Sequence, residues 1–167
     1  MTKRISPTLR DATEEDAQAI ADIYNHFINE TVVTFEVEPL MASQMLQRIK
    51  ETTQSYPWLV AEVAGKVAGY AYASRWHARH AYRFTAEMTV YLDPSQVGQG
   101  LGTLLYQELI QVLSSTEIRT VIGGIALPNE ASVALHESLG FRKAAHYQRV
   151  GFKFDRWIDV GYWQRML

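Results

Sequence analysis

The stretch VYLDPSQVGQGLGTLLYQEL, residues 90 to 109, constrains the fold more than any other part of the chain. Its apolar, β-branched start ends at Asp93-Pro94, and leucines at helical spacing follow, so it predicts a strand that turns into a helix. Gly98, Gly100 and Gly102 stand in the turn, where the main chain can approach a ligand without Cβ clashes. Because unpaired N–H groups at a helix N-terminus attract phosphate, the stretch predicts a pyrophosphate site. The alternative is a turn that only needs flexible residues.

Two common phosphate-binding motifs do not fit this spacing. A nucleoside-triphosphate loop requires Gly-Lys-Ser/Thr, and this turn contains no Lys. A dinucleotide fingerprint requires a glycine where Thr103 stands, and it follows the first strand of a βαβ unit. Here the turn follows the third strand of a predicted hairpin sheet. Both alternatives are therefore disfavoured.

The rest of the chain predicts strands and helices within a single domain, residues 1–167. We expect the class α/β (α+β), with a mixed, largely antiparallel central sheet of about seven strands flanked by about four helices. The predicted elements are a strand over 8–12, a helix from a Thr13–Asp16 capping box to about Asn29, a helix ending before Pro57, two strands joined at Ala64-Gly65-Lys66, the strand FTAEMTVYL, the helix after the glycine turn, the strand RTVIGGIAL, a short helix between Asn129 and Gly140, and a closing hairpin.

Composition limits the classes of partner. The 16 Lys and Arg against 18 Asp and Glu give a net charge of -2, so the positive field that draws proteins to nucleic acid is absent. The chain has no cysteine, which excludes a disulfide framework and thiolate metal sites. The start has no apolar leader, and no run approaches the ~18 apolar residues of a membrane span. We expect a soluble, cytoplasmic protein with no nucleic-acid or membrane partner.

The glycine turn resembles that of a known family. GQGLG after VYLDP, with a helix behind it, is similar to the acyl-CoA pyrophosphate loop of the GNAT family of N-acetyltransferases, usually Gln/Arg-x-x-Gly-x-Gly/Ala. Val97 stands at the Gln/Arg position, with Gln96 beside it, so a side-chain contact is missing while the backbone contacts remain. The resemblance implies the GNAT fold and acetyl-CoA as co-substrate, without a metal. The implied cofactor-binding residues are Val90, Leu92, Val97, Gly98, Gly100, Leu101, Gly102, Thr103 and Asn129.

Four blocks spread over the chain resemble one branch of this family, the phosphinothricin and methionine sulfoximine acetyltransferases. They are TAEMTVYLDP, YPWLVAEVAGKVAGYAYASRWHAR, LPNEASVALHESLGF and DVGYWQRML. The resemblance implies acetyl transfer to the α-amine of a small amino acid or analogue (phosphinothricin, methionine sulfoximine, methionine sulfone), directly in a ternary complex. The alternatives are an N-acetyltransferase for a protein N-terminus or a polyamine, or a non-catalytic module that senses acyl-CoA.

Such a reaction needs a base for the amine, a donor to the oxyanion and an acid for the thiolate. Glu87 stands in an otherwise apolar strand, where burial would raise the pKa of its carboxyl group; it can instead be an outward-facing strand residue. The resemblance places the branch's catalytic Glu at Glu87 and a His at His136, which can accept or supply a proton or simply pack. Tyr106 is a second proton-donor candidate.

In the family a bulge frees a backbone N–H of the strand around Val90 for the oxyanion, and the cofactor's pantetheine arm adds itself like a strand. Asn129 then contacts that arm or caps its own helix.

The segment SRWHARHAYRF precedes the Glu87 strand and is rich in Arg and aromatic residues. An α-carboxylate prefers a bidentate guanidinium, and by the branch's pattern Arg79 would bind it. Arg75 and Arg79 can instead be solvated surface charges. Two histidines here, His77 and His80, lack a fixed third ligand and make a weak metal hypothesis. The predicted substrate-binding residues are Phe35, Arg75, Trp76, Arg79 and Tyr82.

The C-terminal segment is strongly aromatic, with Trp157, Tyr162 and Trp163 within seven residues. These side chains can complete the core of the sheet, or they can form the face of a homodimer, because aromatic residues are enriched at interfaces. Relatives in the branch are commonly dimers, so we expect a homodimer.

Overall fold

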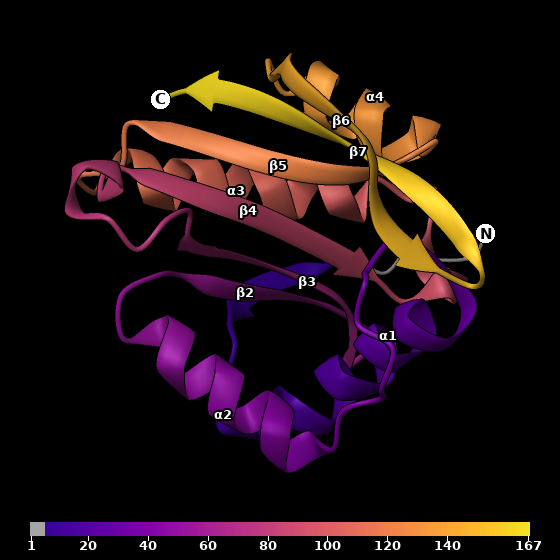
Figure 1. Ribbon diagram of the computed structural model, residues 1–167. Helices are drawn as coiled ribbons and strands as arrows, with labels where there is room; N and C mark the ends of the chain where they lie inside the picture. The colour runs from indigo at the N-terminus through magenta and orange to yellow at the C-terminus, as the bar shows by residue number, and fades with distance from the viewer. Residues whose placement is uncertain (1–5) are drawn as a thin grey trace.

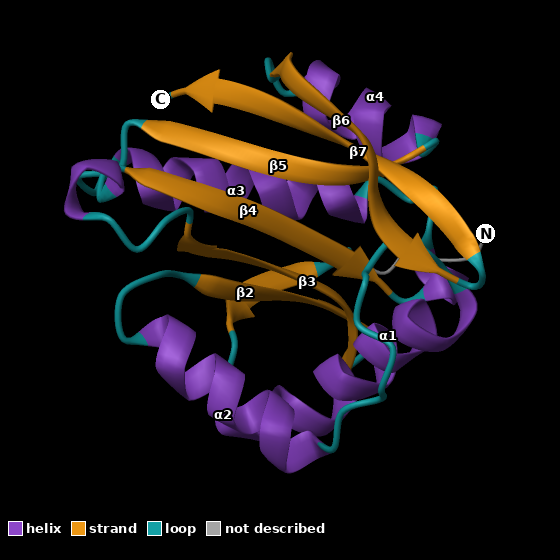
Figure 2. Cartoon of the chain, viewed as in Figure 1, coloured by secondary structure: helices purple, strands orange, loops and turns teal. Residues whose placement is uncertain are grey.

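The computed structural model describes residues 6–167 and forms one seven-stranded sheet with four α-helices (Figure 2). The strand order is β1-β2-β3-β4-β5-β7-β6, and only the β4–β5 pair is parallel. The predicted fold class and element order are confirmed. The expected lack of an apolar leader falls in part on residues 1–5, which lie outside the described range. The elements are β1 (Thr8–Asp11), α1 (Ala17–Glu30), α2 (Ala42–Thr53), β2 (Trp58–Val63), β3 (Lys66–Arg75), β4 (Thr85–Leu92), α3 (Leu101–Ser114), β5 (Thr120–Leu127), α4 (Glu130–Ser138), β6 (Arg142–Lys153) and β7 (Arg156–Met166), with short 3-10 turns at Glu14–Asp16, His80–Tyr82 and Pro94–Gln96.

Helices cover both faces of the sheet, with α1 and α2 on one face and α3 on the other (Figure 1). Alternate residues of β2 supply the two resulting cores, because successive side chains of a strand point to opposite faces. Trp58 and Val60 pack with α1 and α2, whereas Leu59 and Ala61 pack with α3. The strand β2 is therefore buried on both faces, whereas most of the edge strand β6 is exposed. Within residues 6–167, no helix combines the length and apolar character needed to cross a bilayer.

The predicted helix boundaries follow from local capping. The Asp16 carboxylate accepts the backbone N–H of Thr13 at 2.7 Å, but the first turn is a 3-10 turn and the α-helix begins only at Ala17. The side chain of Asn129 accepts the N–H of Ser132 at 3.1 Å and so caps α4, as expected. Capping thus fixes where α4 begins, which matters for the site described below.

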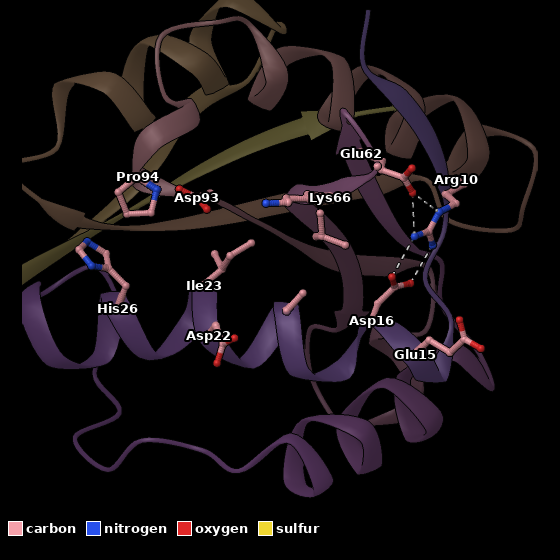
Figure 3. Close-up of a pocket in the computed structure, with 13 residues that line it drawn as sticks. Arg10, Glu15, Asp16, Asp22, Ile23, His26, Glu62, Lys66, Asp93 and Pro94 are labelled. Atoms are coloured by element: carbon pink, nitrogen blue, oxygen red, sulfur yellow. Dashed lines mark hydrogen bonds and ion pairs between the residues drawn. The ribbon is translucent and has the colours of Figure 1, made fainter. Parts of the chain in front are cut away.

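A polar cleft of about 550 Å³ lies between α1 and the β2–β3 hairpin (Figure 3). In it Asp16 and Glu62 converge on Arg10: the guanidinium donates to both Asp16 oxygens at 2.8 and 2.9 Å and to Glu62 Oε2 at 3.1 Å. The hydrogen bond from Arg10 is the main reason that the pKa of the Asp16 carboxyl group lies below its usual value. This cluster ties the first strand to the start of α1.

We expect Asp16→Asn to lower the free energy of unfolding at pH 7 by about 1–2 kcal/mol, at the low end for a bond between charged groups because a third of Arg10 is exposed. The pKa of Asp16 is lowered by folding, so its contribution is present above about pH 4 and is lost as the pH falls through the folded-state pKa. Urea unfolding of wild type and variant at several pH values measures this. The control is Asp22→Asn, an exposed residue of the same cleft; an equal loss there would contradict the assignment.

Candidate active site

The glycine turn between β4 and α3 is shaped by left-handed backbone. Gly98 and Gly100 have φ of 77° and 80°, a region that other residues adopt only with strain. Gly100 is the N-cap of α3, so the N–H groups of the first helical turn, from Leu101 onward, have no partner within the helix. The turn therefore presents several backbone donors together with the positive end of the helix dipole.

These donors border a mostly apolar groove of about 550 Å³ between the turn, the end of β4 and one side of α4. The two helices lie close together at Gly102, where a Cβ would contact Leu135 Cδ2 at 3.4 Å. Val97 lies at the exposed rim, and its side chain offers no polar contact. The groove is lined by all nine residues that the sequence pointed to, Val90, Leu92, Val97, Gly98, Gly100, Leu101, Gly102, Thr103 and Asn129.

The groove continues into an opening between β4 and β5. The two strands pair over only three positions, from Thr85–Thr120 to Glu87–Ile122, and then separate. The N–H of Asp93 bonds to β3, and pairing alternates along an antiparallel ladder, so the N–H groups of Val90 and Leu92 point into the opening. The expected bulge is not found against β3, where the register is continuous. Divergence from β5 produces the opening instead.

His136 and Tyr106 lie at the inner end of this opening, around a cavity of about 50 Å³. The carbonyl of Ser132 lies 2.7 Å from His136 Nδ1 and can only accept, so Nδ1 carries the proton. Burial lowers the pKa of His136, which favours a neutral imidazole with a free lone pair on Nε2. The Tyr106 hydroxyl lies 3.4 Å from this Nε2 and donates to Met88 O at 3.1 Å. Burial raises the pKa of Tyr106, so its hydroxyl stays protonated.

Glu87 lies on the opposite face of β4 from Met88. Its carboxylate is half-buried, and burial alone raises the pKa of this group. No hydrogen bond or ion pair within residues 6–167 involves it. An unpaired carboxylate with a raised pKa is a group that can take a proton from a ligand.

Two adjacent glycines of β5 make room for these groups, and the sequence analysis missed them. A Cβ on Gly123 would overlap the ring of His136. A Cβ on Gly124 would lie 3.1 Å from Tyr162 Cε1 and 3.5 Å from Glu87 Oε1. Paired glycines inside an apolar strand, as in RTVIGGIAL, are the signal that was available, because interior glycine marks a close approach.

The predicted substrate-binding residues lie in three places. Trp76 lies near Glu87, because its ring meets Tyr162 edge-on at 5.3 Å, and Tyr162 borders the Glu87 carboxylate across Gly124. Tyr162 was expected only as a core or dimer residue. Phe35 lies elsewhere, against Gly151 of β6.

The other three predicted residues lie at the exposed connection from β3 to β4. Arg75 ends β3, Arg79 precedes the 3-10 turn, and Tyr82 contacts the ring of His77 at 5.1 Å. Neither Arg donates a hydrogen bond to any side chain in the described part of the chain. Their guanidinium groups are thus available to a ligand. In the same described range, no cluster of three or more metal-ligating side chains occurs.

Comparison with known proteins agrees with this arrangement. A phosphinothricin N-acetyltransferase of Streptomyces viridochromogenes is 42% identical over 94% of this chain and 86% of its own length. An L-methionine sulfoximine/L-methionine sulfone acetyltransferase of Salmonella typhimurium is 35% identical over 96% of this chain and 94% of its own. The crystal structure of a phosphinothricin acetyltransferase from Sinorhizobium meliloti in complex with acetyl-CoA superimposes with a TM-score of 0.94, at 38% identity over 98% of this chain and 89% of that one.

The family model for the acetyltransferase (GNAT) domain matches residues 9–161, which include β1 from its second residue, every element from α1 to β6 and the first half of β7. The match includes the glycine turn before α3 and the opening between β4 and β5. It also includes Glu87 and His136, which lie beside that opening. The chain therefore belongs to the GNAT acetyltransferase family.

Proposed function

We propose that the chain is an acetyl-CoA-dependent N-acetyltransferase that modifies the α-amine of a small amino acid or analogue. The observation that carries this proposal is the pair of proton-accepting groups, Glu87 and His136, on the two sides of an opening that leads from the glycine turn. The relatives named for phosphinothricin and for methionine sulfoximine and sulfone support those compounds as acceptors.

The groove fits acetyl-CoA. Its apolar lining suits the pantetheine arm, and the unpaired N–H groups that begin at Leu101 suit the pyrophosphate. When bound, acetyl-CoA supplies the acetyl thioester. The N–H groups of Val90 and Leu92 are the donors available to the arm and to the thioester carbonyl.

Glu87 is the proposed base, since its unpaired carboxylate can take the proton that an α-ammonium must lose before it attacks. We assign the proton that the departing thiolate needs to the Tyr106 hydroxyl, which stays protonated and lies 3.4 Å from the unprotonated Nε2 of His136. Arg79 is the proposed ligand of the α-carboxylate, and Trp76 with Tyr162 forms an aromatic wall beside the reacting amine.

Release of free thiol from acetyl-CoA, followed with a thiol reagent, tests the function. We expect turnover with methionine sulfoximine, methionine sulfone or phosphinothricin, and none with spermidine or a short peptide. The matched control is each acceptor's N-acetylated form, which has no amine to attack. Turnover on the peptide or polyamine alone would keep the fold and cofactor and reject the acceptor pocket; cofactor binding without any turnover would indicate a sensing module.

We further propose a cytoplasmic homodimer. The edge strand β6 and the start of β7 leave large aromatic side chains more than half exposed, among them Tyr147, Phe152 and Trp157. Phe152 and Trp157 contact each other at 5.0 Å and form a continuous apolar patch. The cytoplasm is where acetyl-CoA is available as a co-substrate. Light scattering on the purified protein and cell fractionation measure the two properties, and a monomeric mass would reject the dimer.

A further inference from the structure

The loop between α1 and α2, residues Thr31–Met41, is here called the strap. Figure 1 shows it rising from α1 past the end of β4 toward the β6–β7 hairpin before it descends to α2. Besides bonds at its two ends, three contacts hold its middle to the helices: the Tyr24 and Thr34 hydroxyls lie 2.8 Å apart, Arg48 donates twice to Glu36, and the Asn25 amide bonds to both backbone groups of Leu40. These contacts hold the strap against α1 and α2.

One hydrogen bond joins the strap to the β6–β7 hairpin. Lys153, the last residue of β6, donates from Nζ to the carbonyl of Thr34 at 2.9 Å. Within residues 6–167 it is the only hydrogen bond between the strap and the β6–β7 hairpin. Gly151 lies on the same face of β6, two residues earlier, and the Phe35 ring rests where its Cβ would be.

Lys153 is unusual because its side chain is buried, with 3% of the residue exposed. No carboxylate in the described part of the chain pairs with it, and burial lowers the pKa of its ammonium group. A buried lysine without an ion pair is costly, and besides the strap carbonyl its ammonium faces only the Phe154 ring among the described residues, 5.1 Å from the ring centroid. Its ammonium has one protein acceptor, the strap carbonyl.

The strap carries side chains that border the reaction site. Val33 lines both the acetyl-CoA groove and the small cavity that holds His136 and Tyr106. Phe35 covers β6 two residues further along the strap. A shift of the Thr34 carbonyl would therefore move both Val33 and Phe35, although Lys153 itself does not line either cavity.

We propose that Lys153 is a positioning residue, which holds the strap across the opening between β4 and β5 and so shapes the cavity around His136 and Tyr106, where the amine would meet the thioester. Its contact with the Thr34 carbonyl sets where Val33 and Phe35 stand when the amino acid binds. The backbone donors of the glycine turn are independent of this contact. This inference rests on the proposed acetyltransferase function.

The test is Lys153→Met, which keeps the length and apolar stem of the side chain and removes its donor. We expect the KM for the amino-acid acceptor to rise about 10-fold or more, as for a lost hydrogen bond to a charged group. The Kd for acetyl-CoA should change less, because Val33 is one of many residues that line its groove. Hydrogen exchange should show faster exchange in residues 31–41. Lys153→Arg, which restores a donor, should recover part of the acceptor KM.

The matched control is Lys143→Met, the same substitution at an exposed position of the same strand. It should change neither the acceptor KM nor the exchange of the strap. A purely structural role for Lys153 would lower the unfolding midpoint and the active fraction at an unchanged KM, and that result would overturn the proposal.

Gly151→Ala is a second, independent variant that leaves Lys153 in place. Its new Cβ would displace the Phe35 ring, so the acceptor KM and the exchange of the strap should both rise, by less than in Lys153→Met. If Lys153→Met does not fold, an unchanged KM in Gly151→Ala overturns the proposal. Hydrogen exchange needs no turnover, so the tether can be tested even if wild type acetylates none of the proposed acceptors.

Discussion

Glu87→Gln is expected to lower kcat by about 100- to 10,000-fold, the usual contribution of a general base. The carboxylate has no partner in the described chain, and burial raises its pKa, so the substitution removes a proton acceptor without breaking a bond. The KM for acetyl-CoA should change little, because the glycine turn is separate from Glu87. Initial rates with both substrates varied measure these effects. The control is Glu117→Gln, an exposed residue after α3, which should match wild type.

The raised pKa of Glu87 predicts how the rate and the stability of the protein change with pH. Wild-type kcat/KM should fall on the acid side as the pH drops through the raised pKa of Glu87, and the Gln variant should lack that limb. The raised pKa also means that ionised Glu87 lowers stability, because stability falls as the pH rises from about 4.5 through the folded-state pKa. At pH 7 the variant should therefore be at least as stable as wild type. A full rate with an unchanged profile would remove Glu87 from the mechanism.

Arg79→Ala is expected to raise the KM for the amino acid about 10- to 100-fold with a smaller change in kcat, because a bidentate bond between charged groups is lost. The exposed guanidinium has no partner within residues 6–167, so folding should be unaffected. The decarboxylated amine of the same acceptor has nothing for Arg79 to bind, and its KM should not change. Kinetic measurements with the amino acid and with its decarboxylated amine, in wild type and variant, show whether the loss depends on the carboxylate.

Arg83→Ala is the matched control, since Arg83 lies in the same connection, where its guanidinium donates to the His80 carbonyl and lies over the Phe84 ring. It should leave the acceptor KM unchanged. Equal binding of the amino acid and its decarboxylated amine to wild type would show that Arg79 does not bind the carboxylate.

The sequence alone predicted the fold in detail because its local signals agree. Asp93-Pro94 ends β4, the glycines that follow adopt left-handed backbone, and Asn129 caps α4 where the sequence places a helix start. The mostly apolar β4 lies between β3 and β5, which is typical of a strand covered on both faces. Each of these features is decided by a few neighbouring residues.

Contacts between distant segments were not predictable in the same way. Strand alternation cannot say that Tyr162 of β7 lies beside Glu87, since only the pairing of β5 with β7 brings them together. The contact of Lys153 with Thr34 joins residues 119 positions apart. The capped start of α4 was foreseen, but the tautomer of His136 depends on which carbonyl its ring reaches in the folded helix.

The adjacent glycines of β5 have a consequence for inhibition. Because successive residues of a strand face opposite ways, Gly123 leaves space for His136 on one face of the sheet and Gly124 leaves space on the other for Tyr162, which borders Glu87. In the proposed mechanism the amino acid and the cofactor therefore reach the opening from different sides. A competitor of the amino acid that occupies only the side with Glu87, Trp76 and Tyr162 would bind equally well whether or not the groove is full, so abundant cellular acetyl-CoA would not weaken it.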